Sequence, residues 1–423
     1  MASSAELTLT PEVHTLDNGL SVIAEFLPYV HSVSIGVWIK TGSANEIPAV
    51  AGISHFLEHM LFKGTPTRSS RQLMEEIESR GGHMNAFTSK EYTCLYVKIL
   101  DQHLDVALDV LADIIKHSEF NDFEKERNVI LEEIASGIDV PDEHIHDMLS
   151  EKHWPEHPLG RPIAGTDETV TNTTLDDIRD YKTHWYCPKN MIVSLVGSFD
   201  EATIISRMRG HFGELESDKI EHDWTAPNSP GGLIWEERDV AQNHLAMAFP
   251  GTSIVGAGRY NYDMLSSVLG GGSTSRLFDT IREEAGLAYS IYSYNSMYQH
   301  AGALGIYAAI APENLRQTLD LIRDEIKKLQ DVPVGADELN SNREQLKGGL
   351  LLALEGTFSR MTRMARSLMF HDRVTPIPEI LEHVDAVTAE DIQLLAQKMF
   401  SDDTCTMAIL GPRVFEGDVA LGL

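Results

Sequence analysis

The second half of the chain repeats the order of strands and helices expected in the first half. Runs of β-branched or alternating residues predict strands, and apolar residues spaced three and four apart predict helices. In the first half, these patterns cover residues 12–26 (two strands about Asn18-Gly19), 33–39, 53–61, 72–79, 83–88, 92–99, 104–115, 123–134, 175–183 and 191–197. In the second half, they cover 243–249, 260–269, 274–284, 289–294, 303–309 and long helices from 315 and 337. We therefore expect an α+β fold of two similar domains, each a largely antiparallel β-sheet with helices packed on one face.

A polar stretch separates the two halves. Residues 213–232 are rich in proline and glycine, which is typical of a segment between domains. We expect an N-terminal domain at residues 10–213, a linker at 214–231 and a C-terminal domain at 232–423.

The expected helix 53–61 contains two histidines and a glutamate at a spacing that suits metal-dependent hydrolysis. His55 and His59 are four residues apart and so share one helix face, close enough for both imidazoles to reach one Zn²⁺. Glu58 borders the same face and can take a proton from a water activated by the metal. The pattern His-x-x-Glu-His is the inverzincin signature. The alternative is two half-buried histidines on a core helix.

Zinc in a hydrolase needs a third protein ligand and an open fourth position. Glu126 and Glu133 are seven residues apart, two turns along the expected helix 123–134, and both could face the metal. Together with Glu124 and Glu132 they could equally form a solvated acidic stripe. The residues alone do not choose between these readings.

The chain resembles the pitrilysin/insulinase family of zinc peptidases, and most closely its mitochondrial processing peptidase branch, along nearly its whole length. The resemblance is carried by residues 52–65 (GISHFLEHMLFKGT), 81–86 (GGHMNA), 126–133 (ERNVILEE) and 157–166 (HPLGRPIAGT). It implies that Glu133, which lies 74 residues after His59, is the third ligand of one Zn²⁺ per chain. It also implies that Glu126 orients a ligand or the zinc site.

The resemblance assigns further roles to residues outside the metal motif. It implies that the glycine-rich loop Gly270, Gly271 and Gly272 handles substrate at a chamber entrance, and that Arg282 and Tyr289 are directed at the substrate carbonyl. The alternative for that pair is a surface arginine and a core tyrosine. Met84, Asn85 and Ala86 lie on an expected sheet edge, where an extended peptide can add as a strand.

The second half has no metal motif of its own. The helix that corresponds to 53–61 contains Tyr262 to Ser267, with no histidine and no paired carboxylates, so we expect no metal there. Four other histidines, His144, His146, His153 and His157, lie in a polar run that we expect to be a loop; we interpret them as surface or packing residues. Cys94, Cys187 and Cys405 have no paired spacing and are expected to be buried thiols.

Composition excludes several function classes. The 423 residues carry a formal net charge of −30, which disfavours nucleic acid and anionic membranes. The N-terminus has no signal-peptide pattern and no apolar run is long enough to span a bilayer, so we expect a cytoplasmic protein without a membrane span. We expect a zinc endopeptidase that hydrolyses unfolded peptides inside a closed chamber. The alternative is a non-catalytic structural or assembly subunit of the same fold.

The expected sites are divided between the two halves of the chain. The metal motif lies in the first half, and Arg282 and Tyr289 lie in the second. In family members with four such domains on one chain, the first and fourth face each other across the chamber. This implies a homodimer with two shared sites, or alternatively a heterodimer with an inactive sister subunit.

Overall fold

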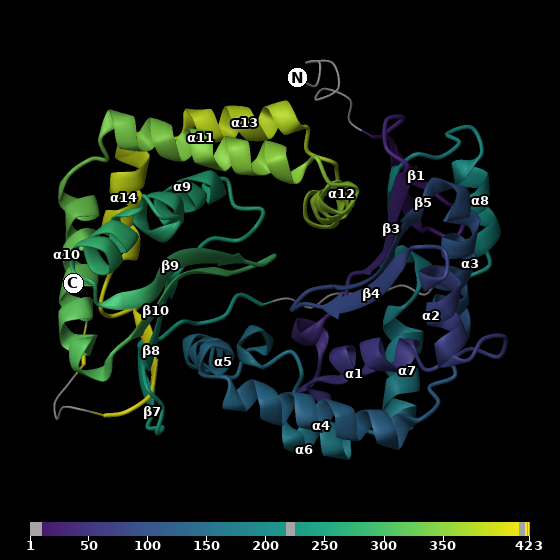
Figure 1. Cartoon of the computed structure of the whole chain (residues 1–423), viewed down its shortest axis with the longest axis horizontal. Coiled ribbons are helices and arrows are strands. Elements are labelled where there is room, and N and C mark those ends of the chain that lie inside the picture. Colours follow the sequence, from purple (N-terminus) through teal and green to yellow (C-terminus); the bar gives the residue numbers. More distant parts are fainter. Residues whose placement is uncertain (1–10, 217–224, 414–418, 421, 423) are drawn as a thin grey trace. The chain divides into compact units, whose positions relative to one another are not determined.

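The computed structural model describes residues 11–216, 225–413, 419, 420 and 422, and it contains two compact units (Figure 1). Unit 1 comprises residues 1–135, 162–223 and 351–378, and unit 2 comprises 136–161, 224–350 and 379–423. Each unit therefore includes a segment from the other half of the chain. Residues 217–224 of the expected linker lie outside the described residues. The domain boundaries expected from the sequence, 10–213, 214–231 and 232–423, remain a prediction.

Unit 1 is built on a six-stranded sheet in the order β1-β2-β6-β3-β5-β4. Its strands are β1 (Val13–Thr15), β2 (Ser21–Phe26), β3 (Ser32–Ile39), β4 (His83–Thr88), β5 (Thr93–Leu100) and β6 (Met191–Gly197). The pair β2 and β6 is parallel, and the other neighbours are antiparallel. Gly19, with φ of 90°, lies in the turn of the expected first hairpin.

Unit 2 repeats this topology without a counterpart of β1. Its five-stranded sheet has the order β7-β11-β8-β10-β9. Its strands are β7 (Gly232–Glu236), β8 (Asn243–Pro250), β9 (Ala288–Met297), β10 (Gly302–Ile310) and β11 (Thr406–Leu410). Here too one pair, β7 and β11, is parallel and the rest are antiparallel. The predicted α+β fold with two similar, largely antiparallel domains is confirmed.

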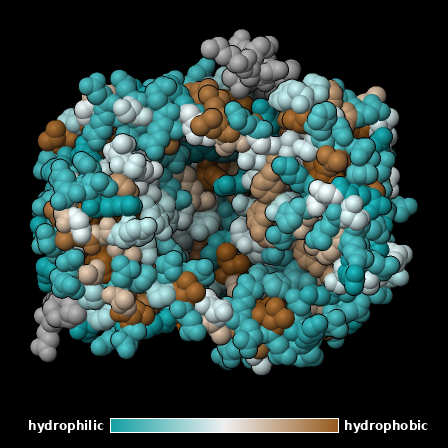
Figure 2. All heavy atoms as spheres, in the orientation of Figure 1, coloured by the Kyte–Doolittle hydropathy of each residue, from teal (hydrophilic) through white to brown (hydrophobic). Residues whose placement is uncertain are grey.

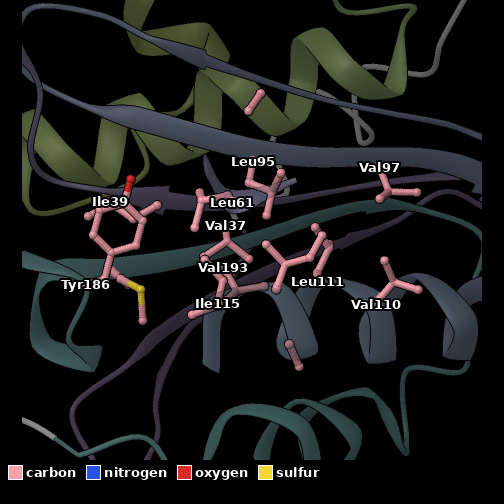
Figure 3. Packing of buried hydrophobic residues seen from close by; sticks show 14 of the residues in the cluster. Val37, Ile39, Leu61, Leu95, Val97, Val110, Leu111, Ile115, Tyr186 and Val193 are labelled. Atoms are coloured by element: carbon pink, nitrogen blue, oxygen red, sulfur yellow. The ribbon is translucent and has the colours of Figure 1, made fainter. Parts of the chain in front are cut away.

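The main core of unit 1 lies between its sheet and the helices that follow the strands. These helices are α1 (Ile53–Leu61), α2 (Ser70–Glu78), α3 (Leu104–His117), α4 (Phe123–Asp139), α6 (Asp167–Asn172), α7 (Leu175–Trp185) and α8 (Ile204–Phe212). Figure 3 shows Val37, Leu95 and Val193 of the sheet packing towards α3, where Val110, Leu111 and Ile115 are fully or almost fully buried. Buried apolar area of this kind is the main term that stabilises the fold.

Unit 2 covers one face of its sheet in the same way. Its helices are α5 (Pro141–His153), α9 (Arg259–Gly270), α10 (Leu315–Asp331), α11 (Ala336–Ala353), α13 (Ile377–Ala386) and α14 (Ala389–Met399), with a π-helical turn at Phe278–Glu284. The core includes Met264 and Leu265 of α9, Ile322 of α10 and Ile392 of α14.

The two halves exchange one helix each. Helix α12 (Thr357–His371), from the second half, packs on β3 and β6 of unit 1, where Met361 and Met364 bury Trp38 and Ile192. Helix α5, from the first half, packs on β7, β8 and β11 of unit 2. Each sheet therefore has helical cover on its second face as well as on the predicted one.

The region around α5 corrects one sequence-based prediction. The polar run that contains His144, His146 and His153 is not the predicted loop: these residues belong to α5, a helix with Pro141 in its first turn. Ile145, Met148 and Leu149 form a short buried stripe within an otherwise polar sequence. The expected helix 274–284 also begins later, at Arg276, and Ser275 before it donates its hydroxyl to the Gly272 carbonyl at 2.6 Å.

The surface of the molecule is largely hydrophilic. Hydrophilic residues cover most of the face visible in Figure 2. Within the described part of the chain, no helix combines the length and apolar character needed to cross a bilayer.

Candidate metal centre

Helix α1 buries its apolar residues in the core, and this leaves its polar side partly exposed. Phe56, Leu57 and Met60 have no exposed surface. His55, Glu58 and His59, on the other side of the helix, keep partial exposure. The helical spacing predicted from the sequence is therefore observed.

The first turn of α1 is fixed by a buried carboxylate. Glu46 accepts hydrogen bonds from the backbone N–H groups of Gly52 and Ser54, at 2.7 and 2.8 Å. A negative charge at a helix N-terminus is favourable because it meets unpaired N–H groups and the positive end of the helix dipole. Gly52 has φ of +95°, and a Cβ there would lie 2.5 Å from the Ala164 carbonyl oxygen. The Glu46 cap and the Gly52 backbone thus fix the start of α1 and, with it, the direction of the two histidine side chains.

Helix α4 brings both candidate glutamates to α1. The ring of Phe123 stacks on Phe56, with centroids 4.9 Å apart, and Ile130 is fully buried. These contacts leave Glu126 with a side chain 7% exposed and Glu133 with one 50% exposed. The two carboxylates therefore share a helix side but have different surroundings.

His55, His59 and Glu133 converge. Their candidate ligand atoms all lie within 4.8 Å of one another, and no other such group of three occurs among the described residues. Each histidine Nε2 lies 3.5 Å from an oxygen of Glu133. Donor atoms of a tetrahedral zinc site with bonds near 2.1 Å are about 3.4 Å apart. Two imidazoles and a carboxylate are also ligands that Zn²⁺ accepts, so these residues fit the ion.

The pKa of His55 and the hydrogen-bond partner of His59 both suit metal binding. Burial, with a smaller contribution from His59, lowers the pKa of His55 to about 4, so its imidazole is neutral near pH 7. His59 Nδ1 lies 2.9 Å from Glu126 Oε1. A carboxylate in that position accepts a hydrogen bond from the Nδ1–H group, which leaves the Nε2 lone pair for a metal.

Glu126 itself is held as a carboxylate. Burial opposes its ionisation, but hydrogen bonds from Lys63 and His59 outweigh burial and lower the pKa of Glu126. Lys63 Nζ lies 2.5 Å from Glu126 Oε2. Glu126 therefore contacts a candidate ligand, whereas the atoms that face both imidazole Nε2 atoms belong to Glu133.

Glu58 lies beside the candidate zinc ligands on α1 and is hydrogen-bonded to Thr88 of β4. Burial raises the pKa of Glu58, although a hydrogen bond from Thr88 opposes the rise. Thr88 Oγ1 donates to Glu58 Oε2 at 2.6 Å. A carboxylate with a raised pKa is suited to general-base work near neutral pH.

Strand β4, which contains Thr88, is an edge strand. It pairs only with β5 in the sheet order, as expected for Met84, Asn85 and Ala86. Met84 and Ala86 are buried in the core, while Asn85 is exposed. An edge strand leaves part of its main chain without a strand partner, although the Ala86 N–H donates to Asn85 Oδ1 at 2.9 Å.

Arg282 and Tyr289 lie together in unit 2. The Arg282 guanidinium carbon is 5.2 Å from the centre of the Tyr289 ring. Tyr289 is 80% exposed, which contradicts the alternative of a core tyrosine.

The glycine-rich loop has packing reasons for two of its glycines. A Cβ on Gly270 would lie 2.4 Å from the Ser293 backbone nitrogen, and one on Gly271 would lie 2.6 Å from the Ser267 Cα. A Cβ on Gly272 would meet only the end of the Gln345 side chain, at 2.7 Å. The close approach of backbone to backbone thus explains Gly270 and Gly271 without a ligand.

The four remaining histidines pack within unit 2. His144 contacts Glu236, His146 contacts Tyr294, His153 contacts Thr406 and His157 contacts the Thr225 carbonyl, at 2.8 to 3.1 Å. They form no metal-binding group with one another among the described residues. Their interpretation as packing residues agrees with these contacts. All three cysteines are free and buried, as predicted.

Three residues near the centre were not found from the sequence. Glu46 caps α1 from a loop, Thr88 binds Glu58 from β4, and Lys63 binds Glu126. Only Lys63 had a usable signal, because it follows His59 by four residues and lies just past the end of α1.

Comparison with known proteins gives a consistent result. Residues 21–167 match the family described as insulinase (peptidase family M16), and residues 172–346 match the peptidase M16 inactive domain. An uncharacterized zinc protease of Bacillus subtilis is 39% identical over 94% of this chain and 98% of its own length. The crystal structure of a protease from Helicobacter pylori is 25% identical with a TM-score of 0.90, covering 96% of this chain and 100% of that one. A Pseudomonas fluorescens structure described as a peptidase M16 inactive domain, 18% identical, covers 97% of this chain and 99% of its own with a TM-score of 0.90, and it shares the fold.

Proposed function

The chain belongs to the insulinase family, peptidase family M16, and we propose that it is a zinc-dependent endopeptidase acting on unfolded peptides. The observation that carries this proposal is the convergence of His55, His59 and Glu133 beside Glu58. Relatives that are named zinc proteases support the choice of metal.

Each residue of the centre has a separate task in this proposal. His55, His59 and Glu133 hold one Zn²⁺ per chain. The zinc ion supplies polarisation of the scissile carbonyl and a lowered pKa for a water molecule. Glu58 takes the proton of the attacking water and passes it to the leaving amine. Thr88 holds Glu58 in place through its 2.6 Å hydrogen bond.

The substrate adds to the edge of β4 as an extended strand. Main-chain groups beside Met84, Asn85 and Ala86 bind the peptide backbone, which requires an unfolded segment but reads little of its sequence. We therefore expect loose sequence specificity. The formal net charge of −30 favours cationic peptides.

Unit 2 contributes the remaining groups. Arg282 and Tyr289 donate hydrogen bonds to the oxyanion that forms on the substrate carbonyl. Gly270, Gly271 and Gly272 handle substrate at the entrance of a closed chamber. These assignments rest on the family resemblance and on the exposed, paired position of Arg282 and Tyr289.

Metal content tests this proposal against a non-catalytic subunit of the same fold. The protein is purified without chelator, and zinc is measured in the wild type and in His55→Ala. We expect zinc in the wild type and its loss in the variant. Absence of zinc from both proteins would favour the non-catalytic subunit.

A further inference from the structure

Lys63 lies at the end of a chain of three charged or polar groups that leads into the metal centre. Its Nζ is 2.5 Å from Glu126 Oε2, and the other oxygen of that carboxylate is 2.9 Å from His59 Nδ1. The Lys63 side chain is 22% exposed and the Glu126 side chain is 7% exposed. The contact is therefore much less screened by water than a surface ion pair.

We propose that Lys63 is a positioning residue that orients His59 for zinc through Glu126. A carboxylate can rotate unless both of its oxygens are bound. Lys63 occupies the oxygen that His59 does not use, and it supplies the positive charge that a buried carboxylate requires. The other oxygen then stays opposite His59 Nδ1, which directs His59 Nε2 towards Glu133. This inference rests on the proposed zinc site.

His55 and His59 differ in the hydrogen-bond partner of their Nδ1 atoms. His55 Nδ1 is buried and has no hydrogen-bond partner within the described ranges. His59 alone is connected to a buried carboxylate and a lysine. Loss of Lys63 should therefore disturb one ligand selectively.

A neighbouring lysine provides a matched control. Lys125 precedes Glu126 in α4, is exposed and lines the same surface cavity of about 750 Å³ as Lys63 and Glu126. No ion pair of Lys125 occurs in the part of the chain that the structure describes. Lys125→Met removes the same charge from the same cavity without removing a contact to Glu126.

The test measures zinc affinity of the metal-free protein by competition with a chromophoric chelator. Loss of an outer contact to a zinc ligand typically weakens binding by about 10- to 100-fold. We expect Lys63→Met to weaken zinc binding by about 10-fold, the lower end of this range. Lys125→Met should bind zinc as the wild type does. Lys63→Arg, which keeps the charge, should retain most of the wild-type affinity. In a Glu126→Gln background, Lys63→Met should cause little further loss because Lys63 acts through Glu126.

A second measurement reports on His59 without metal. The ¹⁵N resonances of its ring should show a protonated Nδ1 in the wild type and a mixture of tautomers in Lys63→Met. Wild-type zinc affinity in Lys63→Met, or effects of Lys63→Met and Glu126→Gln that simply add, would overturn the inference while the zinc site stands. A wild-type chain that binds no zinc would overturn the proposed function and this inference with it. Thermal unfolding of each variant verifies folding, and Lys63→Gln, which also lacks the charge, replaces Lys63→Met if that variant is unstable.

Discussion

Glu58 and Gln have nearly the same shape, and this allows binding and chemistry to be separated at a single residue. In Glu58→Gln, the amide can still accept the hydrogen bond from Thr88. It cannot take a proton from water. We expect zinc to remain bound and the rate of peptide hydrolysis to fall by about 100- to 10,000-fold, the usual contribution of a general base.

Hydrolysis of an unfolded fluorogenic peptide and zinc content measure the two effects in the same sample. Thr88→Val is a useful companion, since it removes the hydrogen bond to Glu58 and retains the carboxylate. If Glu58→Gln cleaved the peptide at a rate near that of the wild type, Glu58 would not be the base.

The two glutamates of α4 should differ in their effect on zinc affinity. Glu133 faces both imidazole Nε2 atoms, whereas Glu126 reaches the metal centre only through His59. We expect Glu133→Gln to weaken zinc binding more than Glu126→Gln, for which about 10- to 100-fold is typical. Chelator competition gives the order directly, and a larger loss in Glu126→Gln would assign the ligand to Glu126.

Single residues show where sequence reasoning succeeded and where it stopped. The spacing of His55, Glu58 and His59 was enough to place them on one side of a helix, because that depends on local geometry alone. The choice between Glu126 and Glu133 was not local, since both lie on the same side of α4. It depends on how α4 packs on α1 through Phe56 and Phe123, which are far apart in sequence.

At the scale of elements, the positions of most strands and of many helices followed from periodicity, but the order of the strands in each sheet and the exchanged helices did not. Helix α5 has few apolar residues, and those it has meet β8 and β11, which lie more than 80 residues away in the sequence. Helix α12 is bound to the first sheet by contacts such as the 2.8 Å hydrogen bond between Thr357 and Ser34. The apolar residues of α12, Met361, Met364, Ala365 and Leu368, have helical spacing, but that spacing does not say which sheet they pack on.

The cap of α1 yields a prediction at this scale. Glu46→Ala removes a buried acceptor from two backbone N–H groups and leaves them unpaired. We expect a loss of about 2 kcal/mol in the free energy of unfolding, typical of hydrogen bonds to a charged group. Denaturant unfolding measures the loss.

Glu46→Gln is the matched control for the cap. Its amide offers one acceptor oxygen and no charge, so its loss should be smaller than that of Glu46→Ala. Equal stability of Glu46→Ala and the wild type would show that the cap does not hold the first turn of α1.

At the scale of the whole molecule, the proposed zinc ligands lie in unit 1 and Arg282 and Tyr289 lie in unit 2. We expect a homodimer with C₂ symmetry in which each site combines the metal of one protomer with the Arg282 and Tyr289 pair of the other. Mixing inactive Glu58→Gln chains with inactive Tyr289→Phe chains should then restore activity, because mixed dimers regain one intact site.

Subunit exchange must be verified with differently tagged chains. If exchange occurs and activity does not return, each protomer completes its own site or requires a different sister chain.

Zinc titration of the metal-free protein tests the central assignment most directly. Peptide hydrolysis is followed while Zn²⁺ is added to the wild type and to His55→Ala. We predict no activity without metal, a rise that saturates at one zinc per chain in the wild type, and no comparable recovery in His55→Ala. Full hydrolysis by metal-free protein, or equal recovery in His55→Ala, would contradict a zinc peptidase centred on His55, His59 and Glu133.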